Sequence, residues 1–358
     1  MSLKIGIPKE RHTSEFRVGL TPVGVSILTK QGHQCYVEKG AGIGSNFSDT
    51  EYEQAGARIA YDEAEVFRRA DLILKVQRPT EEEMSWMADH QTIMAFMMLA
   101  VTPQSQIRLL EQKGAAIVSY ERIEDHNGML PVLYPLSQIG GRMTAQIAAQ
   151  YLQNNRGGKG ILLGGVAGVP PADVVIIGAG VVGMNAAQAF LGMGARVILL
   201  DHDLQKLQSA HEYFDGRITT MVSHDVNLKR VCKFADVLVG AVQIPGEPAP
   251  IIITSEMIAS MRPGSVVIDM SIDQGGCVET SRPMQHNDPT FLVNGVIHYC
   301  VPNLPGVVGR TATHAFLNAA WPFIQLVAEY GIKRAVELNP ALHRGTAIFQ
   351  REMTPETA

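Results

Sequence analysis

The chain has 358 residues, of which 46% are hydrophobic and 18% are charged, so it is long enough for two globular domains. Its formal net charge of −5 provides no basic field that would attract nucleic acid or an anionic membrane surface. The N-terminus lacks the pattern of a signal peptide, and glycines interrupt the longest apolar stretch, so we expect neither secretion nor a membrane span.

The first third of the chain alternates between strand and helix signals. Short apolar runs typical of strands occupy residues 3–8, 34–40, 70–76, 92–100 and 115–121. Thr21 and Pro22 are an N-cap and a first helical residue, and Ser48 with Glu51 has the spacing of a capping box. This alternation predicts a doubly wound α/β fold with a parallel sheet.

A second strand–helix series follows a long predicted helix at residues 137–155. The glycine-rich stretch 156–173 between them reads as a loop that could act as a hinge. Strands are predicted near residues 174–178, 196–201, 235–242, 265–270 and 291–295, and helices in the tail at 313–331 and 332–345. We expect this tail to return to the first domain, so that residues 1–136 are completed by 307–358 and residues 137–306 form the other domain.

A dinucleotide-binding fingerprint opens the second series. A predicted strand runs into Gly178-Ala179-Gly180-Val181-Val182-Gly183, a helix of small residues follows, and a second strand ends at Asp201. Gly178 permits the tight turn, Gly180 lets the backbone approach a pyrophosphate, and Gly183 allows close helix–strand packing. The Asp201 carboxylate would accept hydrogen bonds from ribose hydroxyls and repel a 2′-phosphate, so the pattern predicts NAD as the cofactor.

The cysteines and histidines give no metal signature. The chain has no CxxC pair and no HExxH motif, and its four cysteines are scattered at Cys35, Cys232, Cys277 and Cys300. We therefore predict reduced thiols in a cytoplasmic protein without a metal site.

Further motifs give the chain a family resemblance. With the fingerprint, the segments EFRVGLTP, DLILKVQRP, LSQIGGRMTAQ, AVQIPGEPAP, SIDQGGC and VPNLPG make it similar to the alanine dehydrogenases, over roughly residues 1 to 345. These share a family with the NAD-binding subunit of proton-translocating transhydrogenase. The resemblance implies two Rossmann-like domains separated by a cleft, NAD on the second, and a homo-oligomer, usually a hexamer. It implies an oxidoreductase of amino acid metabolism that reversibly deaminates a small L-amino acid, such as alanine, to a 2-oxo acid and ammonium.

The transhydrogenase branch is the alternative within this family. The segment after Asp201 lacks the longer insertion of that branch, and SIDQGGC resembles the dehydrogenase form, whereas KVQRP and PKER lean toward the transhydrogenase form. The balance favours a dehydrogenase. An NAD-binding, transhydrogenase-like or cofactor-sensing protein without alanine dehydrogenase activity stays open.

The resemblance assigns three residues to substrate binding and catalysis. Arg17 matches the arginine that grips the substrate carboxylate, for which a planar guanidinium is suited. Lys75 matches the lysine that hydrogen-bonds the carbonyl or amino group, at the end of a strand where open α/β sheets bind ligands. Asp273 matches the aspartate between nicotinamide and substrate.

Other matched positions surround the cofactor. Ser137 matches the serine that contacts the cofactor at the start of the interdomain helix, and Asn303 matches the asparagine near the nicotinamide, with Leu304 packed against the ring. Val242 and Ile244 would flank the cofactor, although core packing explains them about as well.

One position departs from the family pattern. The family segment that aligns with residues 92–100 ends in a histidine, the proposed general acid/base, followed by Leu-Ala, and this chain has Met98 there. Methionine cannot usefully donate or accept a proton. Either Lys75 or Asp273 carries the proton, or Met98 forms an apolar wall for a changed substrate, or the chain binds NAD without turning alanine over. An imidazole from elsewhere would have to come from His90, His126, His298 or His314.

Overall fold

The structure is a computed structural model, and it describes residues 2–99, 102–244, 248–349 and 352–353. The chain divides into two compact units. Unit 1 combines Met1–Leu136 with Pro305–Ala358, and unit 2 is Ser137–Leu304. The glycine-rich loop 156–173 lies inside unit 2, so it does not connect the units, and its interpretation as a hinge between domains is wrong.

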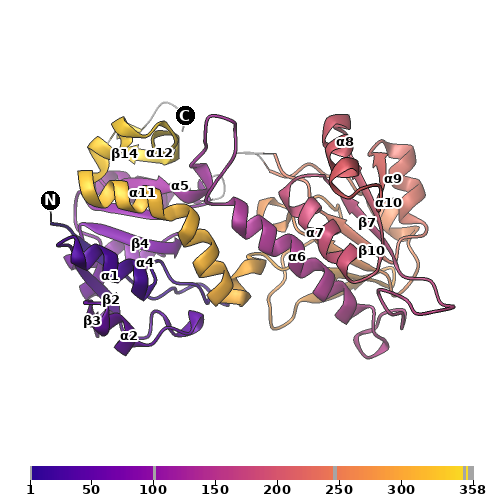
Figure 1. The fold of residues 1–358 in the computed structure, drawn as a ribbon, viewed down its shortest axis with the longest axis horizontal. Coiled ribbons are helices and arrows are strands. Elements are labelled where there is room, and N and C mark those ends of the chain that lie inside the picture. Colours follow the sequence, from indigo (N-terminus) through magenta and orange to yellow (C-terminus); the bar gives the residue numbers. More distant parts are fainter. Residues whose placement is uncertain (1, 100–101, 245–247, 350–351, 354–358) are drawn as a thin grey trace. The chain divides into compact units, whose positions relative to one another are not determined.

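Unit 1 is built on an eight-stranded sheet with the order β15-β14-β6-β5-β4-β1-β2-β3 (Figure 1). Neighbouring strands from β1 to β6 pair in parallel, whereas β14 and β15 are antiparallel. The strands are β1 (Lys4–Ile7), β2 (Gln34–Glu38), β3 (Arg58–Ala60), β4 (Leu72–Gln77), β5 (Thr92–Phe96), β6 (Ala116–Ser119), β14 (Thr346–Phe349) and β15 (Glu352–Met353).

The helices of unit 1 come from both ends of the chain. They are α1 (Pro22–Lys30), α2 (Asp49–Gln54), α3 (Glu63–Arg69), α4 (Glu81–Trp86), α5 (Gln104–Gln112), α11 (Gly309–Leu338) and α12 (Pro340–Gly345), with short 3-10 turns at Ile43–Ser45 and Tyr120–Arg122. Thr21 caps α1 and Ser48 with Glu51 forms a capping box on α2, as the sequence predicts. The backbone of α11 kinks at Gly331, where φ is 73°.

The C-terminal tail packs against the unit 1 sheet. Phe316 of α11 lies 6.1 Å, centroid to centroid, from Phe96 at the end of β5 and from Tyr120. All three rings are at most 5% exposed. Through these aromatic contacts, α11 of the tail packs on one face of the unit 1 sheet (Figure 1).

Unit 2 has a seven-stranded sheet with the order β12-β13-β11-β10-β7-β8-β9, parallel except for β12. The strands are β7 (Asp173–Ile177), β8 (Arg196–Asp201), β9 (Thr219–Val222), β10 (Val237–Gly240), β11 (Val266–Asp269), β12 (Thr290–Val293) and β13 (Val296–Tyr299). Without β12, this is the strand order of the dinucleotide-binding fold, so the predicted doubly wound α/β class is confirmed.

Helices cover both faces of the unit 2 sheet. They are α6 (Tyr134–Tyr151), α7 (Val181–Gly192), α8 (Leu204–Tyr213), α9 (Asp225–Cys232) and α10 (Ser255–Ala259), with 3-10 turns at Asn154–Arg156, Ile272–Gln274 and, leading into unit 1, Leu304–Val308. In β7, Val174 and Ile176 belong to one apolar cluster and Val175 and Ile177 to another. Both faces are therefore buried, which explains why this strand reads as a continuous apolar run.

The predicted strand at 92–100 is too long. The ladder of β5 ends at Phe96, Met98 adopts a left-handed backbone with φ 51°, and Ala100 lies outside the described residues. Five further strands were not predicted from the sequence, namely β3, β9, β13, β14 and β15.

Over the described ranges, no helix is long and apolar enough to cross a membrane. No group of three or more potential metal ligands occurs in that part of the chain. The four cysteines are buried free thiols.

Candidate functional site

The glycine loop of unit 2 connects β7 to α7. Gly178 has φ 105°, and a Cβ there would lie 2.3 Å from the carbonyl oxygen of Ala241. A Cβ on Gly183 would lie 1.8 Å from the carbonyl oxygen of Gly178, whereas one on Gly180 would meet no atom within 4 Å. The first and third glycines are thus required by the fold itself, and the middle one borders open space.

That open space adjoins the N-terminus of α7. Gly180 is the N-cap and provides no side-chain cap, and Val181 and Val182 in the first turn are half-buried. The first amides of a helix have no partner within the helix, and their dipoles favour an anion. These residues therefore fit the pyrophosphate of a dinucleotide.

Asp201 stands at the end of β8, beside the glycine loop, and is 6% exposed. Its Oδ2 accepts a hydrogen bond of 2.7 Å from the backbone N–H of Ala179, and its Oδ1 accepts one of 2.9 Å from the backbone N–H of Asp203. Each carboxylate oxygen can accept more than one hydrogen bond, so a pair of ribose hydroxyls is compatible with these contacts. The carboxylate also fixes the loop to the strand.

Two further predicted residues meet in unit 2. Asp273, in the 3-10 turn after β11, is exposed, and its Oδ1 accepts a 2.9 Å hydrogen bond from the backbone N–H of Asn303. Leu304 is 2% exposed and Ser137 is half-buried.

The loop after β10 carries two more predicted residues. The N–H of Val242 donates to Ser271 Oγ at 3.1 Å and its carbonyl accepts from the same hydroxyl at 2.7 Å, while Ile244 is 38% exposed. Neither Ser271 nor Asp269 was predicted from the sequence. Asp269 is 1% exposed, and its carboxylate accepts hydrogen bonds from the backbone N–H groups of Ser271, Cys277 and Val278. Asp269 thereby holds the turn that presents Asp273. The sequence signal for Asp269 was a carboxylate near the end of the predicted strand at residues 265–270.

Lys75 is the centre of a buried charge cluster in unit 1. It lies in β4 and is 0% exposed. Its Nζ is 2.8 Å from Glu83 Oε1 and 3.3 Å from Glu10 Oε2, and neither carboxylate side chain is more than 2% exposed. Neither glutamate was predicted from the sequence, although Thr80 and Glu83 have the spacing of a capping box and form one.

Arg17 belongs to the same region. Its Nε and Nη2 donate to the two carboxylate oxygens of Glu15, at 2.7 and 2.5 Å, and Arg17 is 3% exposed. A Cβ on Gly19 would lie 2.1 Å from the carbonyl oxygen of Leu74, so this glycine lets the Arg17 segment lie directly against β4. The structure therefore places the segment of Arg17 beside β4, the strand that contains Lys75, and both residues are buried.

The charges of this cluster shift one another. Burial by itself would raise the pKa of Glu15, but the hydrogen bonds and charge of Arg17 hold it at about 2. Burial raises the pKa of Glu10, Lys75 opposes this, and Glu15 adds to it. The pKa of Lys75 is raised because Glu10 and Glu83 outweigh the effect of burial. Lys75 is thus held in its charged form.

Met98 is half-buried beyond the end of β5. Its backbone N–H donates to Glu121 Oε1 at 2.6 Å, and the N–H of Met97 donates to Oε2 at 3.1 Å. Burial raises the pKa of Glu121, against the effect of these N–H donors. The thioether of Met98 has no acid/base chemistry of its own. The titratable group that contacts this turn is the carboxylate of Glu121, which was not predicted from the sequence.

The four histidines named above as possible sources of an imidazole lie away from Lys75 and Met98 in their described contacts. His298 is fully buried between Thr280 Oγ1, at 2.8 Å, and the carbonyl of Val296. The remaining three are exposed, namely His90, His126 and His314. No contact of these four with Lys75 or Met98 is present in the described residues.

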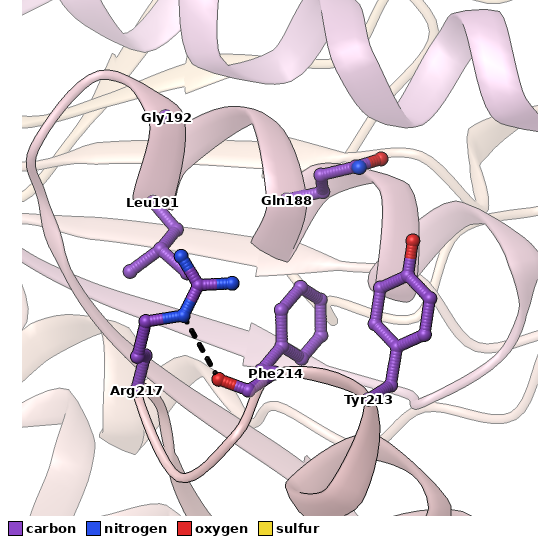
Figure 2. Close-up of a pocket in the computed structure, with 6 residues that line it drawn as sticks. All are labelled: Gln188, Leu191, Gly192, Tyr213, Phe214 and Arg217. Carbon is purple, nitrogen blue, oxygen red and sulfur yellow. Dashed lines mark hydrogen bonds between the residues drawn. The ribbon is translucent and has the colours of Figure 1, made fainter.

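A separate hollow of about 480 Å³ lies between α7 and α8 (Figure 2). Gln188 and Gly192 are at the C-terminal end of α7, and Arg217 donates to the carbonyl of Phe214 at 3.0 Å. The glycine loop is at the opposite end of α7, so this hollow is not the predicted dinucleotide site.

Two family models match nearly the whole chain. The N-terminal domain of the alanine dehydrogenase/PNT family matches residues 6–140, and the C-terminal domain of the same family matches residues 144–356. The alanine dehydrogenase of Methanococcus maripaludis is 45% identical over 98% of this chain and 94% of its own length. That of Mycobacterium tuberculosis is 41% identical over 99% of this chain and 95% of its own length.

Solved structures agree with this family. An L-alanine dehydrogenase superposes with a TM-score of 0.94 at 39% identity, covering 99% of this chain and 98% of the other. A transhydrogenase from Sinorhizobium meliloti has a TM-score of 0.84 at 24% identity, covering 98% of this chain and 100% of the other, which shows a shared fold. The two domain models and the full-length relatives lead to one conclusion, that this chain belongs to the alanine dehydrogenase/PNT family.

Proposed function

We propose that the protein is an NAD-dependent dehydrogenase of the alanine dehydrogenase type, which deaminates L-alanine or a related small L-amino acid reversibly to a 2-oxo acid and ammonium. The observation that carries this proposal is the pair of buried cations, Lys75 in β4 and Arg17 in a segment that lies against β4, in a chain of this family. A buried guanidinium and a buried ammonium are what a small carboxylate with an adjacent carbonyl group requires.

Arg17 binds the substrate carboxylate in this proposal. Its Nε and Nη2 are held by Glu15, which fixes the guanidinium plane before substrate arrives. Lys75 donates a hydrogen bond to the carbonyl oxygen of the 2-oxo acid, which increases the positive character of the carbon that reacts. Because both cations are buried, substrate binding has to open a path to them.

The cofactor binds to unit 2. The first turn of α7 receives the pyrophosphate beside Gly180, and Asp201 accepts hydrogen bonds from the adenosine ribose. Bound NAD supplies the acceptor of the hydride that leaves the amino acid. The nicotinamide end would be contacted by Asp273, Asn303 and Leu304. The remaining cofactor contacts would come from Ser137, Val181, Val182, Val242 and Ile244.

Met98 is an apolar part of the substrate site in this proposal. Its flexible side chain can adapt to a methyl or longer apolar substituent on the substrate. The proton that a histidine would move therefore has to come from another group.

A panel of 2-oxo acids tests the function. Purified protein with NADH and ammonium should oxidise the cofactor with pyruvate or a related acid, and replacing Lys75 with Met should lower kcat by about 10²–10⁴-fold. Binding of NAD without turnover on any acid would favour the second candidate, a transhydrogenase-like or cofactor-sensing protein. A control variant, Lys229→Met, removes a lysine from an exposed pair with Asp225 and should keep full activity.

We further propose that the chain works in the cytoplasm as a homo-oligomer, with the hexamer expected from the family resemblance. The four buried free thiols fit a reducing compartment. Light scattering of the purified protein measures the oligomer directly.

A further inference from the structure

Glu10 is a buried carboxylate to which the proposed function assigns no role. It lies between β1 and α1, and its residue is 8% exposed. Oε1 accepts the N–H of Val76 at 2.6 Å, and Oε2 accepts the N–H of Gln77 at 3.3 Å while lying 3.3 Å from Lys75 Nζ. This carboxylate therefore contacts the ammonium that the proposed reaction uses.

Among the described residues, the five ion-paired groups of this cluster do not balance when all of them are ionised. Lys75 and Arg17 supply two positive charges, whereas Glu10, Glu15 and Glu83 supply three negative charges, and all five side chains are at most 3% exposed. A surplus buried charge is costly, and a carboxyl group avoids this cost by keeping its proton. One proton more than the ion pairs need is therefore expected in this cluster.

Glu10 is the best place for that proton. Glu15 is bound bidentately by Arg17 and also accepts from the side chain of Gln77 at 3.1 Å. Glu83 has the shorter contact with Lys75 and accepts the N–H of Thr80 at 2.7 Å. Glu10 has the longer contact with Lys75, and its pKa is raised by burial and by Glu15 despite the neighbouring ammonium.

We propose that Glu10 stores the proton of the reaction and passes it through Lys75 to the leaving hydroxyl group of the substrate. This inference rests on the proposed function. Glu10 acts on the substrate only through Lys75, because Lys75 Nζ is the group that contacts both.

In the direction of amination, one proton moves from Glu10 through Lys75 to the leaving hydroxyl group. Ammonia adds to the 2-oxo acid to give a carbinolamine, whose hydroxyl oxygen accepts a proton from Lys75 Nζ. The carbon–oxygen bond breaks, water leaves, and the nitrogen lone pair forms the C=N⁺ bond of an iminium ion. The Nζ lone pair takes the proton of Glu10, which becomes a carboxylate. Deamination reverses these steps and returns the proton to Glu10.

Met98 cannot supply this proton, and Glu121 does not replace Glu10 as its source. The Glu121 carboxylate accepts the N–H groups of Met97 and Met98, and no contact with Lys75 is found among the described residues. Its contacts hold the turn after β5 in shape. Glu10 is the carboxyl group that combines burial with a contact to Lys75 and is not already fixed by a second cation or a capping box.

Two matched variants test the proposal. Glu10→Gln keeps the shape of a protonated carboxyl group but has no transferable acid proton, and its amide nitrogen cannot accept the hydrogen bonds that one Glu10 oxygen accepts. Glu83→Gln removes the other carboxylate from Lys75 and leaves Glu10 in place. We expect Glu10→Gln to lower kcat by about 10²-fold with a KM for the 2-oxo acid within a few-fold, and to remove one limb of the kcat–pH profile. Glu83→Gln should keep that limb, and Glu10→Asp, which restores a titratable group, should regain it.

An infrared measurement reads the proton without any turnover. The cofactor-free wild-type protein should show the carbonyl stretch of a protonated carboxyl group at neutral pH. This band should disappear in Glu10→Gln and weaken in Glu83→Gln, which removes the surplus negative charge of the cluster, and it should persist in the surface variant Glu65→Gln. A wild-type spectrum without the band overturns the proposal, whatever the variants do. An unchanged pH profile in folded, active Glu10→Gln also overturns it while the proposed function stands. A wild type inactive with every 2-oxo acid overturns the proposed function and, with it, this role for Glu10.

Discussion

The glycine loop of unit 2 and the charge cluster of unit 1 are both proposed anion sites, but they would bind an anion through different interactions. The loop offers main-chain N–H groups at the start of α7 and the space beside Gly180. The cluster offers Arg17 and Lys75, each buried and each paired with a carboxylate. A main-chain site tolerates changes of charge but not of conformation, whereas a buried ionic site tolerates small changes of shape but not of charge balance.

The largest effect that separates the two regions should come from Glu15→Gln. The substitution leaves the Arg17 guanidinium buried without its carboxylate, which should lower the free energy of unfolding by about 3–5 kcal/mol at pH 7. Because the folded pKa of Glu15 is about 2 instead of 4.5, its contribution is present above pH 4.5 and is lost as pH falls toward 2. Urea unfolding at pH 7 and pH 3 should therefore show a difference between wild type and variant that shrinks in acid.

An exposed ion pair provides the control for Glu15. Glu65 pairs with Arg69 at 3.0 Å on the surface of α3, and Glu65→Gln should change the free energy of unfolding by less than about 1 kcal/mol at either pH. A Glu15→Gln difference that stays constant between pH 7 and pH 3 would contradict the assigned charge pairing.

Glycine substitutions in α7 should have the next largest effect, and they act through space instead of charge. Gly183→Ala places a Cβ 1.8 Å from a carbonyl oxygen, which should lower the free energy of unfolding by about 2–3 kcal/mol. Gly192→Ala, in the same helix, meets no atom within 4 Å and should raise it by up to about 1 kcal/mol. Thermal or urea unfolding of both variants, compared with wild type, measures this contrast.

Gly180→Val separates folding from binding at the same loop. Its side chain enters the space beside the first turn of α7, so the affinity for NAD should fall at least about 10-fold while the stability changes by less than about 1 kcal/mol. Titration calorimetry with NAD gives the affinity. Unchanged NAD binding in a folded Gly180→Val protein would show that the pyrophosphate does not lie there.

The same contrast explains what the sequence could predict. The roles of Gly178 and Gly183 follow from local backbone geometry, and the structure has the close approaches that the fingerprint requires. The caps of α1 and α2 are also local and were predicted. The contact between Glu10 and Lys75 could not be predicted, because Glu10 is 65 positions away in the sequence and only the fold brings the two together. Glu83 had a local signal, its capping-box spacing with Thr80, but that spacing does not indicate the contact with Lys75. The strand β14 was missed because it pairs with β6 across more than 200 residues and carries no periodic signal of its own.

Asp201→Ser should produce a smaller effect, on cofactor choice. Removing the carboxylate should weaken NAD about 10-fold and reduce the preference for NAD over NADP, since the charge that repels a 2′-phosphate is gone. Part of the loss comes from the loop itself, because Asp201 Oδ2 also accepts the N–H of Ala179. Asp203→Ala is the control, since that side chain caps α8 through Gln205 and does not contact the glycine loop. Equal loss of NAD and NADP binding in Asp201→Ser would assign the residue to loop structure alone.

Met98→His should have the smallest effect. The left-handed backbone at this position, with φ 51°, suits histidine better than most residues, so the fold should accept the change. If Lys75 already receives a proton from Glu10, an added imidazole should raise kcat with pyruvate by no more than about 10-fold and should add a limb to the pH profile near 6.5. Met98→Asn, polar and suited to the same backbone but without a titratable group, should give no such limb. A gain of about 10³-fold in Met98→His would instead mean that unit 1 has no effective proton source, and that its buried charges serve to bind substrate only.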